Sequence, residues 1–284
     1  MLVDLVRVQT PDGCALDGAL QRPTTAARLP LDSVILVHGT GSNFYQSTML
    51  EFLAERFLAQ GVAALRVNTR GHDGISIAVT ARGGLRAGAA YEAVEDCRHD
   101  LAGWMTFARA QLGARVALLG HSLGAVKCIY ATVHEPSLDP SLVIAVSPPR
   151  LSYAGFCQTP QREEFLQTYG RAEALVQSGQ ASTLIEATMP LPMTISAGGY
   201  VEKYGPDERI NFLPLVSRLR CPSLFVFGSK EVESNVAFQN LPSGLTALSR
   251  DVAVVEGADH FYTGKRAELA AAIDGWLAST RQSR

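Results

Sequence analysis

The stretch Val116-Ala117-Leu118-Leu119-Gly120-His121-Ser122-Leu123-Gly124 decides the fold class of this chain. Its first four residues predict a strand buried on both faces, and residues 125–133 predict the helix that follows. Between them stands the only G-x-S-x-G sequence in the chain. A strand that turns directly into a helix strains the central residue, and side chains at Gly120 or Gly124 would collide. We therefore expect Ser122 to project as a nucleophile at the carboxyl end of a sheet, near a helix N-terminus that favours negative charge.

The remaining sequence alternates short apolar runs with helical patterns. A β-hairpin is predicted over residues 5–21, and further strands are predicted at 34–37, 62–67, 142–146, 224–227 and 252–255. Helical spacing of apolar residues lies between these strands and again near the end of the chain, where Leu269, Ile273 and Leu277 share a face. This alternation is typical of a mostly parallel sheet with helices on both faces, which is an α/β fold.

One segment, residues 149–221, breaks this alternation. It contains no convincing buried strand, and it is too long for a plain loop in a compact domain. We interpret 149–221 as a mainly helical cap insertion that lies over the sheet. Residues 1–148 and 222–284 would then form the core domain.

A serine hydroxyl needs an adjacent base, and His260 is the best candidate among the six histidines. It lies directly after the last predicted strand, in Gly257-Ala258-Asp259-His260-Phe261. The chain order expected with this serine turn is nucleophile, then acid, then histidine. We predict that His260 is the general base.

The acid should follow a strand between Ser122 and His260, and two glutamates qualify. Both follow the predicted strand 224–227, in Gly228-Ser229-Lys230-Glu231-Val232-Glu233. Glu231 stands where the acid is usual in this topology, and Glu233 is the alternative. Either carboxylate would orient the imidazole and stabilise its cation.

The loop after the strand 34–37 offers donors for a developing oxyanion. It reads His38-Gly39-Thr40-Gly41, and its glycines allow the backbone to approach a substrate closely. Each preorganised donor contributes about 3 kcal/mol to an acyl-transfer transition state. We assign the two donors to the backbone N–H groups of Thr40 and Leu123.

Composition narrows the class of partner. A formal net charge of −2 gives no electrostatic reason to expect nucleic acid or an anionic membrane as a partner. The N-terminus lacks the pattern of a signal peptide, and no apolar run approaches the roughly 20 residues of a membrane span. Five cysteines without C-x-x-C spacing argue against a disulfide framework and a zinc knuckle. We expect a cytoplasmic protein, either a monomer or a homodimer, that acts on a small ester-type molecule.

Together these motifs resemble the α/β-hydrolase superfamily, in its serine esterase and lipase branch. The resemblance covers nearly the whole chain and also includes Asn68-Thr69-Arg70-Gly71-His72. It implies an eight-stranded sheet, a cap over the active site, hydrolysis of an ester, thioester or amide, and no metal or cofactor. The departure is a glutamate at the acid position, where aspartate is commoner.

Three functions fit this sequence. The leading hypothesis is a carboxylesterase that forms an acyl-enzyme on Ser122. An acyltransferase or a carbon–carbon bond hydrolase would use the same residues with another pocket or acceptor. A non-catalytic ligand-binding protein of the fold is the alternative of another class.

Overall fold

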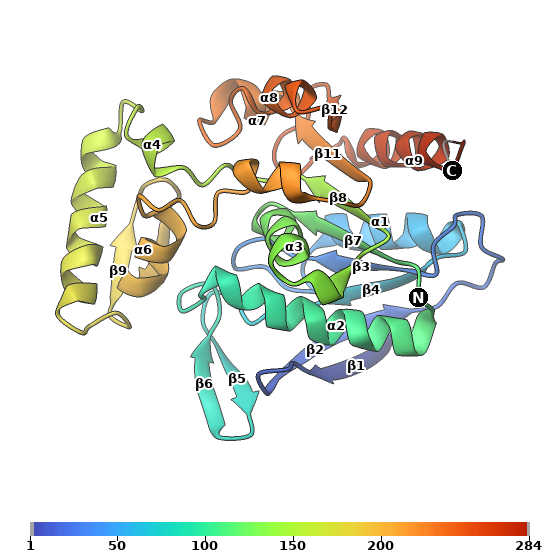
Figure 1. The fold of residues 1–284 in the computed structure, drawn as a ribbon, viewed down its shortest axis with the longest axis horizontal. Helices are drawn as coiled ribbons and strands as arrows, with labels where there is room; N and C mark the ends of the chain where they lie inside the picture. Colours follow the sequence, from blue (N-terminus) through green and yellow to red (C-terminus); the bar gives the residue numbers. More distant parts are fainter. Residues whose placement is uncertain (1–2, 283–284) are drawn as a thin grey trace.

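The computed structural model describes residues 3–282, including the side chains of residues 3–280, and its centre is a twisted sheet (Figure 1). The sheet has ten strands: β1 (Asp4–Gln9), β2 (Cys14–Gln21), β3 (Ser33–Val37), β4 (Ala63–Val67), β5 (Ser76–Thr80), β6 (Gly83–Ala87), β7 (Val116–His121), β8 (Leu142–Val146), β11 (Ser223–Gly228) and β12 (Asp251–Val255). Their order is β12-β11-β8-β7-β3-β4-β2-β5-β6, and β1 pairs with β2.

The strands from β12 to β4 in this order run parallel, and the pairings that involve β1, β2, β5 and β6 are antiparallel. The fold class is therefore the α/β class that the sequence predicts. The sheet has two strands more than the eight expected, because β5 and β6 form a hairpin that extends its edge. Ile77, Val79 and Leu85 of this hairpin are exposed, so its pattern does not show a buried face.

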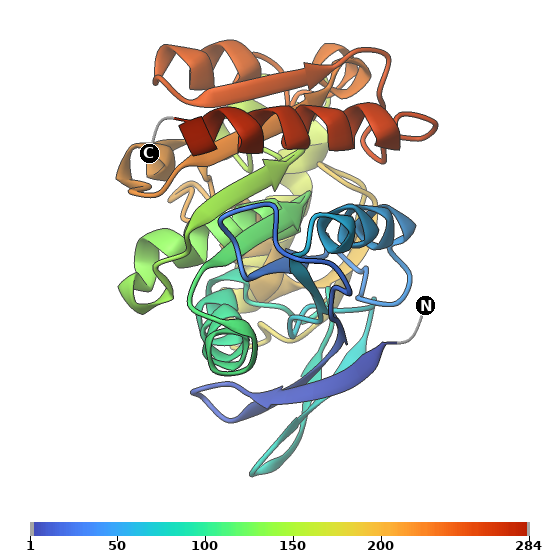
Figure 2. The same ribbon diagram turned by 90° about the vertical axis from the view of Figure 1, so that its right-hand side faces the viewer.

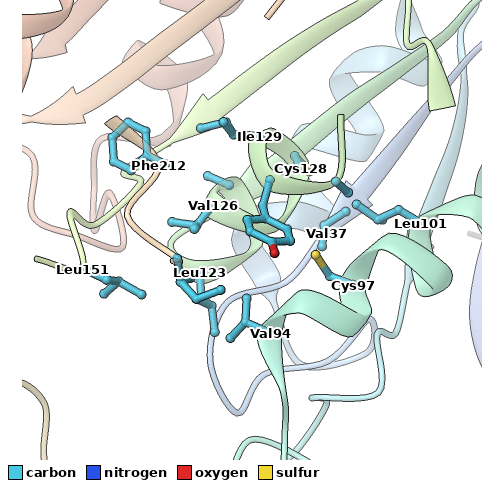
Figure 3. Close-up of a cluster of buried hydrophobic side chains, with 14 of the residues drawn as sticks. Val37, Val94, Cys97, Leu101, Leu123, Val126, Cys128, Ile129, Leu151 and Phe212 are labelled. Carbon is cyan, nitrogen blue, oxygen red and sulfur yellow. The ribbon is translucent and has the colours of Figure 1, made fainter. Parts of the chain in front are cut away.

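Helices cover both faces of the sheet. Two apolar clusters form the core, one with α2 (Cys97–Leu112) and α3 (Leu123–His134), the other with α1 (Thr48–Ala59) and α9 (Arg266–Gln282). Successive residues of β3 belong to opposite clusters, as a strand buried on both faces requires. Figure 2 shows α9 along the end of the sheet that holds β11 and β12. Figure 3 shows the first cluster around α3, with Leu123 and Val126 pointing into it.

The segment 149–221 lies outside the large sheet. It contains α4 (Tyr153–Phe156), α5 (Arg162–Gln177), β9 (Leu184–Ala187), β10 (Met193–Ser196), α6 (Ala197–Tyr204) and a 3₁₀ turn η3 (Leu213–Arg218). Helices dominate it, but β9 and β10 pair with each other in a small antiparallel sheet that the sequence does not predict. Strands of four residues are too short to give a clear alternation. The division of the chain at 149 and 221 into core and cap stays a prediction.

The remaining elements are short. They are the 3₁₀ turns η1 (Val94–Asp96) and η2 (Pro136–Leu138), and the helices α7 (Ser229–Ser234) and α8 (Leu241–Ala247). Across residues 3–282 no helix is both long enough and apolar enough to cross a bilayer. Three of the five cysteines, Cys14, Cys97 and Cys128, are buried, and Cys157 and Cys221 are half-buried.

Candidate active site

The turn between β7 and α3 holds Ser122 in a strained conformation. Its φ of 56° and ψ of −127° are rare for a residue with a side chain. A Cβ at Gly120 would lie 2.3 Å from the carbonyl oxygen of Gly124, and a Cβ at Gly124 would lie 2.4 Å from that of His38. The Ser122 N–H donates to the Val146 carbonyl at 2.9 Å. The turn is thus closed by contacts that leave no room for side chains at either glycine.

His260 and Glu231 meet at the carboxyl ends of the last two strands. Glu231 lies in α7, directly after β11, and His260 lies in the loop after β12. Nδ1 of His260 lies 2.7 Å from Oε2 of Glu231, whose side chain is almost fully buried. Glu233 is exposed at the far end of the same short helix. Of the two glutamates, Glu231 is the one that contacts His260.

Two further donors hold the other oxygen of Glu231. The Gly228 N–H donates to Oε1 at 2.8 Å, and Ser147 Oγ donates to the same atom at 2.5 Å. Tyr262 OH lies 3.0 Å from Ser147 Oγ. Burial, followed by the charge of Glu231, raises the pKa of Tyr262 well above its usual range, so its phenol stays protonated. Because the Ser147 hydroxyl donates to Glu231, the Tyr262 O–H donates a hydrogen bond to Ser147 Oγ. A chain of hydrogen bonds therefore runs from Tyr262 through Ser147 and Glu231 to His260.

Sequence reasoning missed Ser147 and Tyr262. Ser147 follows β8, the neighbour of β11, and its place at the carboxyl end of that strand was the one available signal. Tyr262 lies two residues after His260, but the sequence does not indicate that its side chain points towards Ser147.

His121 contacts the loop that carries His260. Its Nε2 lies 2.8 Å from the His260 carbonyl oxygen, and the two imidazole centres are 4.8 Å apart. Burial, and then the nearby His260, lower the pKa of His121 to about 3, so its ring is neutral. Nε2–H therefore donates to the carbonyl and holds the His260 loop against β7.

The loop after β3 brings Thr40 to the same place. A Cβ at Gly39 would lie 3.0 Å from the Ser122 Cβ, so the two turns are in close contact. Leu123 is the first residue of α3, and its side chain is buried in the core (Figure 3). The expectation that the N–H groups of Thr40 and Leu123 bind an oxyanion stays a prediction.

One cavity of about 450 Å³ is shared by Ser122, His260 and Thr40. It is lined by Gly39, Thr40, Ser42, Gln46, Ser47, Thr48, Met49, His121, Ser122, Leu191, His260, Phe261 and Arg266. Leu191 comes from the segment 149–221, so that segment supplies part of the wall. Ser122, His260 and Thr40 therefore open onto one cavity, as a hydrolytic site requires.

The described side chains offer no metal centre. Within residues 3–280, histidine, cysteine, aspartate and glutamate do not gather in threes that could hold a metal ion. The expectation that the protein needs no metal or organic cofactor stays a prediction.

Comparisons with known proteins agree with this architecture. Residues 34–272 match the alpha/beta hydrolase family. The alpha/beta hydrolase GrgF from Penicillium sp. sh18 is similar in structure, with a TM-score of 0.69 at 16% identity over 98% of each chain. A search of curated proteins found no match.

Two further solved structures are similar to this chain. Est1E from Butyrivibrio proteoclasticus, solved with bound ferulic acid, has a TM-score of 0.65 at 15% identity, over 96% of this chain and 98% of its own. A monoglyceride lipase from Saccharomyces cerevisiae has a TM-score of 0.63 at 15% identity, over 98% of this chain and 96% of its own. At such low identity these similarities show the fold alone. Because the family match spans most of the sequence, the chain belongs to the alpha/beta hydrolase family.

Proposed function

We propose that this protein is a serine hydrolase that cleaves carboxylic esters through an acyl-enzyme formed on Ser122. The observation that carries the proposal is the contact of 2.7 Å between His260 Nδ1 and Glu231 Oε2, beside a strained serine on the same cavity. A histidine held in this way presents Nε2 as a base, which is the arrangement that activates a serine hydroxyl. The monoglyceride lipase among the similar structures supports the ester class.

The proposed reaction has two halves. Ser122 Oγ attacks the ester carbonyl while His260 Nε2 takes its proton, and Glu231 stabilises the resulting imidazolium. The N–H groups of Thr40 and Leu123 bind the tetrahedral oxyanion. His260 then protonates the leaving alcohol. Water, activated by the same histidine, attacks the acyl-enzyme, releases the acid and restores the Ser122 hydroxyl.

A panel of short-chain p-nitrophenyl esters tests the proposal. Ser122→Ala should lower kcat by as much as a millionfold, and Glu231→Gln should lower kcat by about ten-thousandfold because the imidazole loses its orienting charge. Glu233→Gln is the matched control and should keep wild-type kcat. Wild-type turnover by Ser122→Ala would overturn the proposal, and loss of activity in Glu233→Gln alone would move the acid to Glu233.

The same panel separates acyl transfer and non-catalytic binding from hydrolysis. An added alcohol acceptor should not divert the acyl group of a hydrolase, whereas an acyltransferase would form a new ester. A non-catalytic ligand-binding protein would show no turnover and no p-nitrophenol burst. The cytoplasmic location and the monomeric or homodimeric state stay predictions, which cell fractionation and analytical ultracentrifugation would check.

A further inference from the structure

The wall of the active-site cavity carries a single fixed charge. Of the lining residues, only Arg266 has a side chain that is always charged, and none is a carboxylate. Burial keeps His121 neutral, and Glu231 lies behind His260, outside the lining. The space in front of Ser122 is therefore bounded by a permanent positive charge with no negative charge on the same wall.

The Arg266 side chain is held by a hydrogen bond and has no acidic partner among the described side chains. Its Nη2 donates to Thr48 Oγ1 at 2.7 Å, which ties the first residue of α9 to the first residue of α1. Across the side chains of residues 3–280, Arg266 forms no ion pair, whereas the neighbouring Lys265 pairs with Glu268 at 3.0 Å. One hydrogen bond uses one of the five donors of a guanidinium. The remaining donors can bind a group that enters the cavity.

The surrounding backbone also favours a negatively charged ligand. Both α1 and α9 begin at this wall, and the N–H groups of a first helical turn and the helix dipole favour negative charge. Ser42, Gln46 and Ser47 add polar side chains to the lining, and Met49, Leu191 and Phe261 add apolar surface. The cavity thus combines apolar surface with one positive charge suited to an anion.

From this arrangement we propose that the natural ester carries a carboxylate, which Arg266 binds while Ser122 attacks the ester carbonyl. The inference rests on the proposed function and specifies its substrate class. Arginine suits this task because its planar fork binds a carboxylate through two parallel hydrogen bonds. The carboxylate can belong to the acyl group or to the alcohol, and both positions present the same chemistry to Arg266.

Two pairs of isosteric esters test the proposal and distinguish these positions. In the acyl pair, monophenyl glutarate is compared with the phenyl ester of glutaramic acid, in which a neutral amide replaces the carboxylate. In the alcohol pair, the butyrate ester of 4-hydroxybenzoate is compared with that of 4-hydroxybenzamide. The readout is the ratio of kcat/KM for the anionic ester to that for the neutral ester, after subtraction of uncatalysed hydrolysis.

Wild type should favour the anionic ester in at least one pair, by tenfold to a hundredfold as an order of magnitude for a charged hydrogen bond. Arg266→Gln should bring this ratio close to one, and Arg266→Lys should restore part of it. Lys265→Gln is the matched control, because it removes the same charge one residue away and outside the cavity, and it should keep the wild-type ratio. Any unfolded fraction of a variant cancels, since both esters meet the same preparation.

The results that would contradict the substrate class differ from the result that would also contradict the proposed function. Hydrolysis of the neutral esters with a wild-type ratio near one in both pairs, or a preference that Arg266→Gln leaves unchanged, would overturn the substrate class and leave the proposed function standing. Failure of wild type to hydrolyse any of the four esters, together with the p-nitrophenyl panel, would overturn both.

Discussion

Ser147 links Tyr262 to Glu231 on the buried side of the candidate site. Its Oγ donates a hydrogen bond to Glu231 at 2.5 Å and accepts one from the Tyr262 hydroxyl. All three side chains are buried. Ser147→Ala should lower kcat about tenfold, since a hydrogen bond to a charged group contributes about 1.5 to 3 kcal/mol, while KM changes little. Steady-state kinetics with a p-nitrophenyl ester measures both constants.

Ser223 provides the control for Ser147. It is equally buried, but its Oγ has no hydrogen-bond partner among the described residues. Ser223→Ala should therefore keep wild-type kcat. Equal effects of the two substitutions would show that Ser147 acts only through packing.

The glycines of the serine turn give a second prediction at this scale. Gly124→Ala would place its Cβ 2.4 Å from two backbone oxygens, so it should destabilise the fold by about 1 to 3 kcal/mol or more. Gly170 is the control, because it lies within α5 and a Cβ there meets nothing within 4 Å. Gly170→Ala should stabilise the protein by about 0.5 to 1 kcal/mol. Urea unfolding of both variants measures the difference, and a Gly124→Ala protein as stable as wild type would contradict the account.

These residues show which features of the site can be predicted from contiguous sequence and which cannot. The serine turn is predictable because its strand, its two glycines and its helix are contiguous. The distance from Glu231 to the end of its strand favours it over Glu233. The contacts of Ser147, Tyr262 and His121 were not predictable, because each depends on how the ends of neighbouring strands face one another.

At the scale of elements, a buried ion cluster connects α3 to α6. Glu92 pairs with Lys127 of α3, and its Oε2 lies 3.5 Å from Nζ of Lys203 in α6; all three side chains are buried. Lys127 also donates to Thr69 Oγ1 at 2.9 Å. Burial alone would raise the pKa of Glu92, but the two lysines outweigh it and lower that pKa below its ordinary value.

Removal of the charge of Glu92 tests this cluster. Glu92→Gln leaves two buried lysines without an ion pair among the described side chains and should cost about 3 to 5 kcal/mol of unfolding free energy. Glu268→Gln is the control, because the ion pair of Glu268 with Lys265 at 3.0 Å is exposed on both sides, and it should change stability by less than about 1 kcal/mol. Urea unfolding measures both, and equal stabilities would contradict the prediction.

The elements that the sequence missed share a physical cause. The hairpin β5–β6 exposes most of its apolar side chains, and β9 and β10 are each four residues long. Sequence patterns reveal a strand either through a continuous apolar run or through alternation between a buried and an exposed face. The core strands β3 and β7 contain the apolar runs 34–37 and 116–119. The strands β5, β6, β9 and β10 offer neither signal clearly.

At the scale of the whole molecule, two buried histidines predict acid sensitivity. Burial lowers the pKa of His38 and of His121 to about 3. In the unfolded chain these histidines have the ordinary pKa of about 6.5, so they take up protons below that pH. In the folded chain they stay neutral until the pH approaches 3. Their contribution to stability is therefore complete above about pH 6.5 and is lost as the pH falls towards 3, by about 1.4 kcal/mol per pH unit for each histidine.

His121→Gln isolates one of these contributions. Between pH 7.5 and pH 5, its unfolding free energy should fall by about 2 kcal/mol less than that of wild type. Urea unfolding at the two pH values provides the comparison. Identical losses in both proteins would show that His121 is already protonated in the folded state at pH 5.

Covalent labelling of Ser122 tests the central claim most directly, because a fluorophosphonate reacts with an activated serine and needs no knowledge of the natural substrate. Intact-mass and peptide mass spectrometry should find one adduct per chain, on the peptide that contains Ser122. Glu231→Gln should label more slowly, Glu233→Gln at the wild-type rate, and Ser122→Ala not at all. An adduct on another residue, or equal labelling of Ser122→Ala, would contradict the account.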